Sequence, residues 1–386
     1  MQKKSKNIFI TGMVPTNTNN RGDDAVFYQL CKILRKKYYK PNITVALRHP
    51  SKLYDNFFRV RSIKNFEHKN KKSSLGKFYK GFNFNDETAH LKKFYKEIKK
   101  ADKIIIGGSP FEGVSNEDIL YGQASYAHYI VFLAKILNIK YDIYAMKQTN
   151  IKNNKLFKLT KFVVENAENV YLREKYSLNV LKKFKIRSNH CKIIGDPVFD
   201  LKVDKKQIEN AGKKLEKKYR FNALNNKAVI ICYRDIYWLK SRNYKKHKRK
   251  IIYLCKKLLE NKFTLYFVPL QDYQTKFEKV DNDNIILNKL KRDLKKNKKI
   301  IVFDKGIDLF QTLYLAKQSN FAVSNRRHIS AFSYLMKKKC FGLVEDGNRE
   351  NVIPMFKHLK MEKNLIDIDK LKGEKFKSKI SKLLNV

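Results

Sequence analysis

The sequence predicts an α/β protein made of two domains, each built on a parallel sheet, that face each other across a cleft. Three observations lead to this fold class. Short apolar runs alternate with longer amphipathic stretches, the alternation starts afresh near residue 225, and 43% of the 386 residues are hydrophobic. Such alternation is typical of parallel sheets, and a chain of this length can bury two cores. We expect an N-terminal domain over residues 1–200 and a C-terminal domain over residues 226–386.

Six apolar runs in the first half are expected to be strands, because each is short and rich in branched or aromatic residues. They span residues 7–11, 43–47, 103–107, 141–146, 169–173 and 191–195. Helical patterns lie between them at about 23–38, 118–138, 155–167 and 175–185. The stretch from about 50 to 100 is aromatic and basic without a clear period, which indicates an irregular insertion with one helix near 87–100.

The second half repeats this pattern after a break. Residues 201–225 include a lysine-rich amphipathic segment at 204–219, and we expect them to form a connecting helix and linker. Five further strands are expected at residues 228–233, 263–268, 299–303, 320–324 and 340–344. Helices are expected at about 245–261, 307–318 and 328–338, and the stretch 370–386 has the pattern of a basic helix.

The charge of the chain is strongly positive. It contains 85 Lys and Arg residues against 36 Asp and Glu residues, a formal net charge of +49. Such a field attracts nucleic acids, anionic lipid surfaces and phosphorylated or carboxylated substrates alike. The lysines are spread along the whole chain, whereas a dedicated nucleic-acid-binding protein more often gathers them on one helix or arm. A basic nucleic-acid-binding protein is therefore the alternative to an enzyme, and binding of nucleic acid is not the favoured interpretation.

The cysteines and the apolar stretches indicate the compartment. The five cysteines are isolated from one another and four lie in apolar segments, which predicts buried thiols in a reducing environment. The first residues are basic, but the apolar run that follows is too short for a signal peptide. The longest apolar stretch, residues 129–139, is half a membrane span. We expect a cytoplasmic protein, with at most peripheral attachment at the inner face of the cell membrane, and no motif predicts a metal site.

Polar residues recur at the points where the expected strands end. Two groups combine glycines with polar neighbours, and they consist of Asn20, Gly22 and Asp23 and of Gly107, Gly108 and Ser109. Three single arginines have the same placement: Arg173, Arg234 and Arg349. Because the carboxyl ends of strands in facing α/β domains converge on one cleft, we expect these residues to line a substrate site.

One cluster combines acid–base and anion-binding side chains. Arg326, Arg327 and His328 follow the expected strand 320–324 and open the helix after it. Histidine gives and takes protons near neutral pH, and arginine forks match carboxylate and phosphate groups. A helix N-terminus adds a positive dipole end. This cluster therefore predicts an active site for an anionic substrate.

Taken in chain order, these pieces resemble the polysaccharide pyruvyl transferase family, and the similarity runs from about residue 7 to residue 352. The early N-x-G-D-x-A stretch of the family is matched by Asn20, Gly22, Asp23 and Ala25, and its glycine-rich turn by Gly107 and Gly108 after Ala101-Asp102-Lys103. Its middle patterns are matched by Arg173, Ser177 and Leu181, and then by Asp196, Pro197 and Phe199. The late R-x-H is matched by Arg326 and His328, with Arg327 in the usually apolar middle place.

The resemblance implies the two-domain fold of nucleotide-sugar glycosyltransferases, called GT-B, with two Rossmann-like domains. It also implies transfer of a pyruvyl group from phosphoenolpyruvate to hydroxyls of a sugar in a cell-surface polysaccharide or lipid-linked precursor, as a cyclic ketal. No cofactor is implied beyond this donor substrate. His328 is then the expected general acid/base and Arg326 a catalytic residue. The arginines at positions 173, 234, 326 and 349 are expected to bind the donor.

The chain departs from the family pattern at three places. Lys147-Gln148-Thr149-Asn150 replaces a G-x-G-P stretch, only two glycines remain at 107–109, and Arg349 stands where a late lysine is usual. These changes lie where an acceptor would bind, so the identities of the acceptor and of the donor both stay open. The alternative enzyme is a GT-B-type glycosyltransferase that uses a nucleotide sugar.

Overall fold

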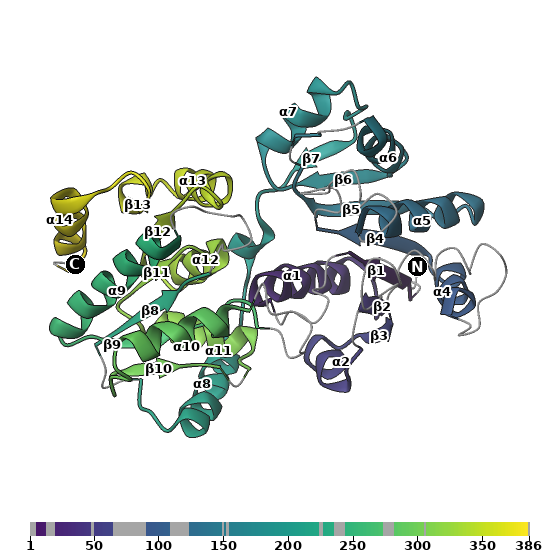
Figure 1. The fold of residues 1–386 in the computed structure, drawn as a ribbon. Coiled ribbons are helices and arrows are strands. Elements are labelled where there is room, and N and C mark those ends of the chain that lie inside the picture. Colours follow the sequence, from purple (N-terminus) through teal and green to yellow (C-terminus); the bar gives the residue numbers. More distant parts are fainter. Residues whose placement is uncertain are drawn as a thin grey trace. The chain divides into compact units, whose positions relative to one another are not determined.

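The structure is a computed structural model that describes residues 5–12, 20–47, 50–64, 90–108, 123–148, 150–151, 154–223, 227–234, 244–272, 282–304 and 306–384. The chain divides into two compact units (Figure 1). The first comprises Met1–Asn17 and Asp23–Asp200, and the second comprises Thr18–Gly22 and Leu201–Val386. The described residues Asn20, Arg21 and Gly22 therefore belong with the second unit, although they lie early in the sequence.

The first unit is built on a parallel sheet. Within its described residues seven strands lie in the order β3-β2-β1-β4-β5-β6-β7. The strands are β1 (Asn7–Thr11), β2 (Asn42–Leu47), β3 (Arg61–Lys64), β4 (Lys103–Gly107), β5 (Tyr141–Met146), β6 (Asn169–Leu172) and β7 (Cys191–Ile193). The helices beside them are α1 (Arg21–Lys37), α2 (Lys52–Phe58), α4 (His90–Lys99), α5 (Gln123–Ile136), α6 (Asn154–Glu165) and α7 (Lys175–Lys183). A 3₁₀ turn at Pro197–Asp200 ends the unit.

The second unit repeats the same plan. Its described strands form a six-stranded parallel sheet in the order β10-β9-β8-β11-β12-β13. The strands are β8 (Ala228–Cys232), β9 (Thr264–Phe267), β10 (Ile300–Val302), β11 (Phe321–Ser324), β12 (Lys339–Val344) and β13 (Leu365–Asp367). The helices are α8 (Lys205–Tyr219), α9 (Tyr244–Glu260), α10 (Asp283–Asp293), α11 (Leu309–Gln318), α12 (Arg327–Leu335), α13 (Arg349–His358) and α14 (Gly373–Leu384), with a 3₁₀ turn at Glu362–Asn364.

Burial of the strands explains why these segments form sheets. All residues of β4, β5, β8 and β9 are buried, as expected for parallel strands that are covered on both faces. Each unit has its own apolar core, formed by strand residues such as Ile104 and Ile143 in the first and Val229 and Leu265 in the second. A fully buried side chain of this kind contributes roughly 1.5–3 kcal/mol relative to an exposed one.

All strands expected from apolar runs are present, with ends within two residues of the expected bounds. The prediction of an irregular insertion over about 50–100 is wrong for its first part, because α2 and β3 form there and β3 adds a parallel edge strand to β2. Residues 65–89 lie outside the described part of the chain. The segment expected to connect the domains contains α8, which packs within the second unit, where Tyr314 on α11 donates a hydrogen bond to Glu216.

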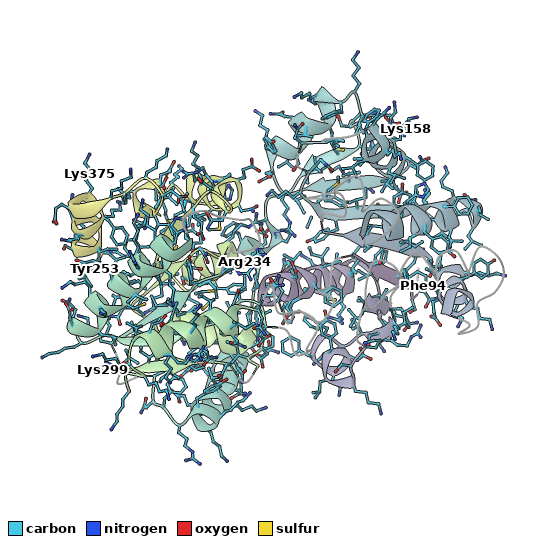
Figure 2. All side chains as sticks on the ribbon, in the orientation of Figure 1. Phe94, Lys158, Arg234, Tyr253, Lys299 and Lys375 are labelled. Carbon is cyan, nitrogen blue, oxygen red and sulfur yellow. The ribbon has the colours of Figure 1, made fainter. Side chains whose placement is uncertain are left out.

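Four of the five cysteines are buried free thiols, as the sequence predicts. Burial raises the pKa of Cys31 and of Cys255 to about 12. Across the described ranges, no helix combines the length and the apolar character needed to cross a membrane. Lysines on different elements, such as Lys158, Lys299 and Lys375, are exposed to solvent (Figure 2). The positive charge is thus distributed over the surfaces of both units.

Candidate active site

The second sheet has a switch point between β8 and β11. The chain winds outward from β8 through β9 to β10, and it then returns to place β11 on the other side of β8. Ligands of open parallel sheets bind at the carboxyl ends of the strands where the order reverses in this way. Arg234, which is labelled in Figure 2, follows β8. Residues 325–328 follow β11. The structure therefore brings two of the predicted site segments together.

A tight turn carries the chain from β11 into α12. The hydroxyl of Ser324 accepts a hydrogen bond from the Arg326 N–H at 2.8 Å and donates to the Arg326 carbonyl at 2.9 Å. Arg326 is the N-cap of α12 in an extended conformation, and Arg327 and His328 are the first two helical residues. These two side chains are half-buried. The positive end of the helix dipole is thus located at the switch point.

The Arg326 side chain is bound to a buried carboxylate. Its Nη2 lies 2.5 Å from Oδ1 of Asp283, and its Nε lies 3.2 Å from both oxygens. Asp283 also accepts the N–H groups of Leu270 and Gln271, each at 3.0 Å. Arg326 is 8% exposed and Asp283 is 1% exposed. The pair links the start of α12 to the start of α10.

Asn325 joins the two strand ends of the switch point. Its Oδ1 accepts the N–H of Arg234 at 2.7 Å, and its Nδ2 donates to the Arg234 carbonyl at 2.8 Å. The same Nδ2 donates to Oε1 of Glu345 at 2.6 Å. Asn325 and Glu345 are both buried. Asn325 directly precedes the predicted site residue Arg326 in the sequence, but only the fold shows that it is paired with Glu345.

Gly22 lies directly against His328. A Cβ atom built on Gly22 would come 1.9 Å from His328 Nδ1, so the imidazole ring packs on the glycine backbone. Gly22 belongs to the second unit, as His328 does. The side chain of Asn20 accepts the Gly22 N–H at 3.0 Å. The predicted groups Asn20/Gly22 and Arg326/His328 therefore come together, although about 300 residues separate them in the sequence.

Arg21, next to Gly22, is fully buried, and its importance was not apparent in the sequence. Its Nη1 and Nη2 bind the two oxygens of Asp272 at 2.7 and 2.8 Å, and its Nε donates to the Ile307 carbonyl at 2.7 Å. The Arg21 N–H and Nη1 both reach the Leu270 carbonyl. All of these partners belong to the second unit. These contacts fix the backbone on which His328 packs.

Arg349 has a different environment. It is the first residue of α13, and its Nη1 lies 2.7 Å from Oδ2 of Asp367 on β13. The hydrogen bond with Asp367 raises the pKa of the Arg349 guanidinium. Burial lowers this pKa, but by less, so the pKa is raised overall. Asp346 and Asp369 lie 3.5 and 3.9 Å from Nη2. The arginine thus neutralises a group of carboxylates beside β13.

The other predicted residues belong to the first unit. Gly107 ends β4, and a Cβ on Gly12 at the end of β1 would come 2.9 Å from the Gly107 carbonyl oxygen, so two strand ends approach closely there. Gly12 and Gly108 both have φ of +74°, which favours glycine. Ser109 lies outside the described residues, and Asp23 is in the first turn of α1.

Arg173, also in the first unit, follows β6. Its Nε donates to the Ala145 carbonyl at 2.7 Å, and its Nη1 lies 3.8 Å from Oδ2 of Asp196. Ala145 has φ of +55°, an uncommon conformation for a residue with a Cβ. Arg173 and Asp196, two residues of the resemblance, therefore lie side by side at the end of β6.

Comparison with known proteins identifies the family and the fold. A family model described as polysaccharide pyruvyl transferase matches residues 20–347, most of the chain. The UDP-GlcNAc 2-epimerase of Methanocaldococcus jannaschii has a TM-score of 0.61 at 14% sequence identity, with 99% of this chain and 93% of that chain covered. The ADP-heptose LPS heptosyltransferase II of E. coli has a TM-score of 0.53 at 9% identity, with 98% of each chain covered.

These structures are GT-B-like, and at such low identity they show the fold alone. The predicted fold class, two Rossmann-like domains of the GT-B kind, is confirmed. The predicted family is confirmed as well. A search of curated protein sequences finds no significant match.

Proposed function

Because the chain belongs to the polysaccharide pyruvyl transferase family, we propose that it transfers a pyruvyl group from phosphoenolpyruvate to hydroxyls of a sugar in a cell-surface polysaccharide or glycolipid precursor. The observation that carries this proposal is the placement of Arg234, Arg327 and His328 at the switch point of the second sheet, around the N-terminus of α12. A site of this kind suits a small donor with two anionic groups, and it provides one acid–base side chain beside that donor.

The donor has two anionic ends, and the site offers two kinds of positive group. In the proposed complex the helix N-terminus and Arg327 hold the phosphate, and Arg234 holds the carboxylate. Arg326 is already paired with Asp283. We therefore propose that Arg326 fixes the start of α12 and adds positive charge to the site without binding the donor directly. Arg173 and Arg349 remain proposed as further anion-binding residues, and each has a carboxylate near its guanidinium.

The proposed role of His328 follows from the proton balance. A proton adds to the methylene carbon of phosphoenolpyruvate, and the neighbouring carbon becomes open to attack by a sugar hydroxyl. That hydroxyl loses its proton, phosphate takes up one proton and leaves as hydrogen phosphate, and a second hydroxyl attacks the same carbon and loses its own proton to close the ketal, so two protons are taken up and two are released. His328 is suited to exchange these protons, because imidazole is both acid and base near neutral pH. Its packing on Gly22 fixes the ring.

The acceptor is proposed from the family, and the location of the enzyme is proposed from the positive charge of the chain. We propose a sugar or lipid-linked saccharide as acceptor, and a cytoplasmic enzyme whose exposed lysines hold it near anionic lipid. Retention of the protein by liposomes of anionic lipid at low salt tests the second part. Nucleic acid is not a proposed partner.

The experiment that tests the function is incubation with phosphoenolpyruvate and a panel of sugar acceptors, with phosphate release and product mass as readouts. Phosphate release that depends on an acceptor, with the product mass of a pyruvyl ketal, is the expected result. His328→Ala should lose most of this activity. Calorimetric binding of nucleotide sugars in the absence of any binding of phosphoenolpyruvate would favour the glycosyltransferase alternative instead.

A further inference from the structure

A second histidine is buried in the second unit, outside the residues proposed for catalysis. His247, in the first turn of α9, is 3% exposed, and its ring lies between two carboxylates. Its Nδ1 is 3.2 Å from Oε2 of Glu345, and its Nε2 is 2.5 Å from Oδ1 of Asp369. Glu345 is also 3% exposed. A carboxylate at such a depth depends on protein donors, because bulk water does not reach it.

A continuous chain of hydrogen bonds leads from this histidine to the candidate active site. The second oxygen of Glu345, Oε1, accepts from Asn325 at 2.6 Å. Asn325 in turn binds both the N–H and the carbonyl of Arg234, at 2.7 and 2.8 Å. Asn325 also directly precedes Arg326, the N-cap of α12. The position of His247 is thus coupled to two strand ends that carry predicted site residues.

The protonation of His247 decides how many of these bonds can form. An imidazolium donates from both ring nitrogens, one to each carboxylate, whereas a neutral imidazole has a single donor. Burial lowers the pKa of His247, but the hydrogen bond with Glu345 and the charges of Glu345 and Asp369 outweigh it, and the pKa is raised. Other charged groups stand around this pair: Arg349 and Asp367 beside Asp369, and Lys250 one turn further along α9.

We propose that His247 is a positioning residue: through Glu345 and Asn325 it holds Arg234 and the start of α12 in the arrangement that binds the anionic donor. Its effect on catalysis rests on the proposed function. The positioning itself is a property of the folded chain, and it can be measured without substrate. This separates the two proposals experimentally.

Amide hydrogen exchange tests the positioning directly. His247→Gln removes the imidazolium, and we expect faster exchange in peptides that cover residues 228–234 and 321–328. A peptide that covers β9 should keep its protection, which shows that the unit stays folded. His128→Gln, the loss of a half-buried histidine in the first unit, is the matched control and should leave both site peptides unchanged. Unaltered exchange of the site peptides in His247→Gln would overturn the proposal.

The pH dependence of protection separates positioning from a merely structural role. After correction for the intrinsic exchange rate, protection of the Arg234 amide in the unaltered protein should decrease as the pH rises through the raised pKa of His247. His247→Gln should lack this step, because a glutamine does not titrate. The absence of the step in the unaltered protein, or its persistence in the variant, contradicts the proposal.

A double-mutant cycle tests whether His247 acts through Glu345. His247→Gln should lower kcat/KM for phosphoenolpyruvate about 10-fold, the effect of losing one charge-assisted hydrogen bond. In a Glu345→Gln background it should have no further effect, whereas additive losses would show that the two residues act independently. If the unaltered protein releases no phosphate from phosphoenolpyruvate, the proposed function fails, and the exchange experiments still decide the role of His247.

Discussion

Gly22 and His328 are in van der Waals contact within the second unit, and no side chain larger than hydrogen fits between them. A Cβ on Gly22 would come 1.9 Å from Nδ1 and 2.4 Å from Cγ of the imidazole. Gly22 does not have a positive φ, so the glycine is not required by its backbone conformation. The close approach to His328 is the physical reason for a glycine at this position.

We expect Gly22→Ala to displace the His328 ring and to lower kcat at least about 10-fold, since a misplacement near 1 Å can cost up to about 100-fold. Overpacking should also cost about 1–3 kcal/mol of stability. Steady-state kinetics with phosphoenolpyruvate and urea unfolding measure the two effects.

Gly212→Ala is the matched control for this variant. Its Cβ would come 2.3 Å from the ring of Tyr314, which is also a severe overlap within the same unit. It should lower stability to a similar extent and leave kcat unchanged. Equal losses of kcat in the two variants would contradict a specific role for the Gly22–His328 contact.

Arg234 and Arg326 should respond differently to truncation. Asn325 binds the backbone of Arg234, so Arg234→Ala keeps both of these hydrogen bonds and removes the guanidinium. We expect the KM for phosphoenolpyruvate to rise about 10-fold or more, with little change in stability. Arg326→Ala instead leaves Asp283 buried without its partner, which should cost about 3–5 kcal/mol. Urea unfolding and steady-state kinetics of both variants distinguish the binding residue from the structural one.

The buried pair of Arg21 and Asp272 should be important for the stability of the second unit. Arg21 is 0% and Asp272 3% exposed, so neither charge is solvated by bulk water. Asp272→Asn leaves the arginine charge uncompensated, and we expect a loss of about 3–5 kcal/mol in urea unfolding. Asp346→Asn is the control, because the Asp346 side chain is 81% exposed and its contact with Arg349 should contribute less than about 1 kcal/mol. Similar losses in both variants would argue against a special cost for the buried charge.

The sequence predicted every strand that appears as an apolar run and missed β3 and β13, two of the four edge strands of the described sheets, for a physical reason. Strands such as β4 are covered on both faces and appear as continuous apolar runs. β3 and β13 lie at the edges of their sheets and bury one residue each, so they leave no such run. The helices α10 and α13 were not predicted, and α13 contains Pro354, a residue that normally marks the end of a helix.

The candidate site was predicted in part. A sequence indicates where strands end, but it does not indicate which buried carboxylates pair with its arginines. Arg234, Arg326 and His328 were found from their placement after strands. Asp283 and Asp272 were not, since nothing local distinguishes a carboxylate that is buried against an arginine 43 or 251 residues away. The chain has 85 basic residues, and the sequence does not show which of them are buried. Arg21 is identified as a buried arginine only by the fold.

A cluster of charges in the first unit predicts a dependence of stability on pH. Lys103, which is 8% exposed, donates to Asp142 at 2.7 Å and to Glu168, and Glu168 also binds Lys140. The hydrogen bonds from Lys103 and Lys140 lower the pKa of Glu168 from 4.5 to about 2, against a smaller opposing effect of burial. A carboxylate with a lowered pKa stabilises the fold above its unfolded pKa, and this contribution is lost as the pH decreases.

We therefore expect Glu168→Gln to be less stable than the unaltered protein by a constant amount above pH 5, and the difference to shrink between pH 4.5 and pH 2. The Glu168 side chain is 39% exposed, so screening by water limits the effect to about 1 kcal/mol. Urea unfolding at a series of pH values measures it. Glu374→Gln, which removes an 84% exposed partner of Lys377, should show no such trend. A difference that stays constant down to pH 2 would mean that Glu168 stabilises the unit through packing instead of charge.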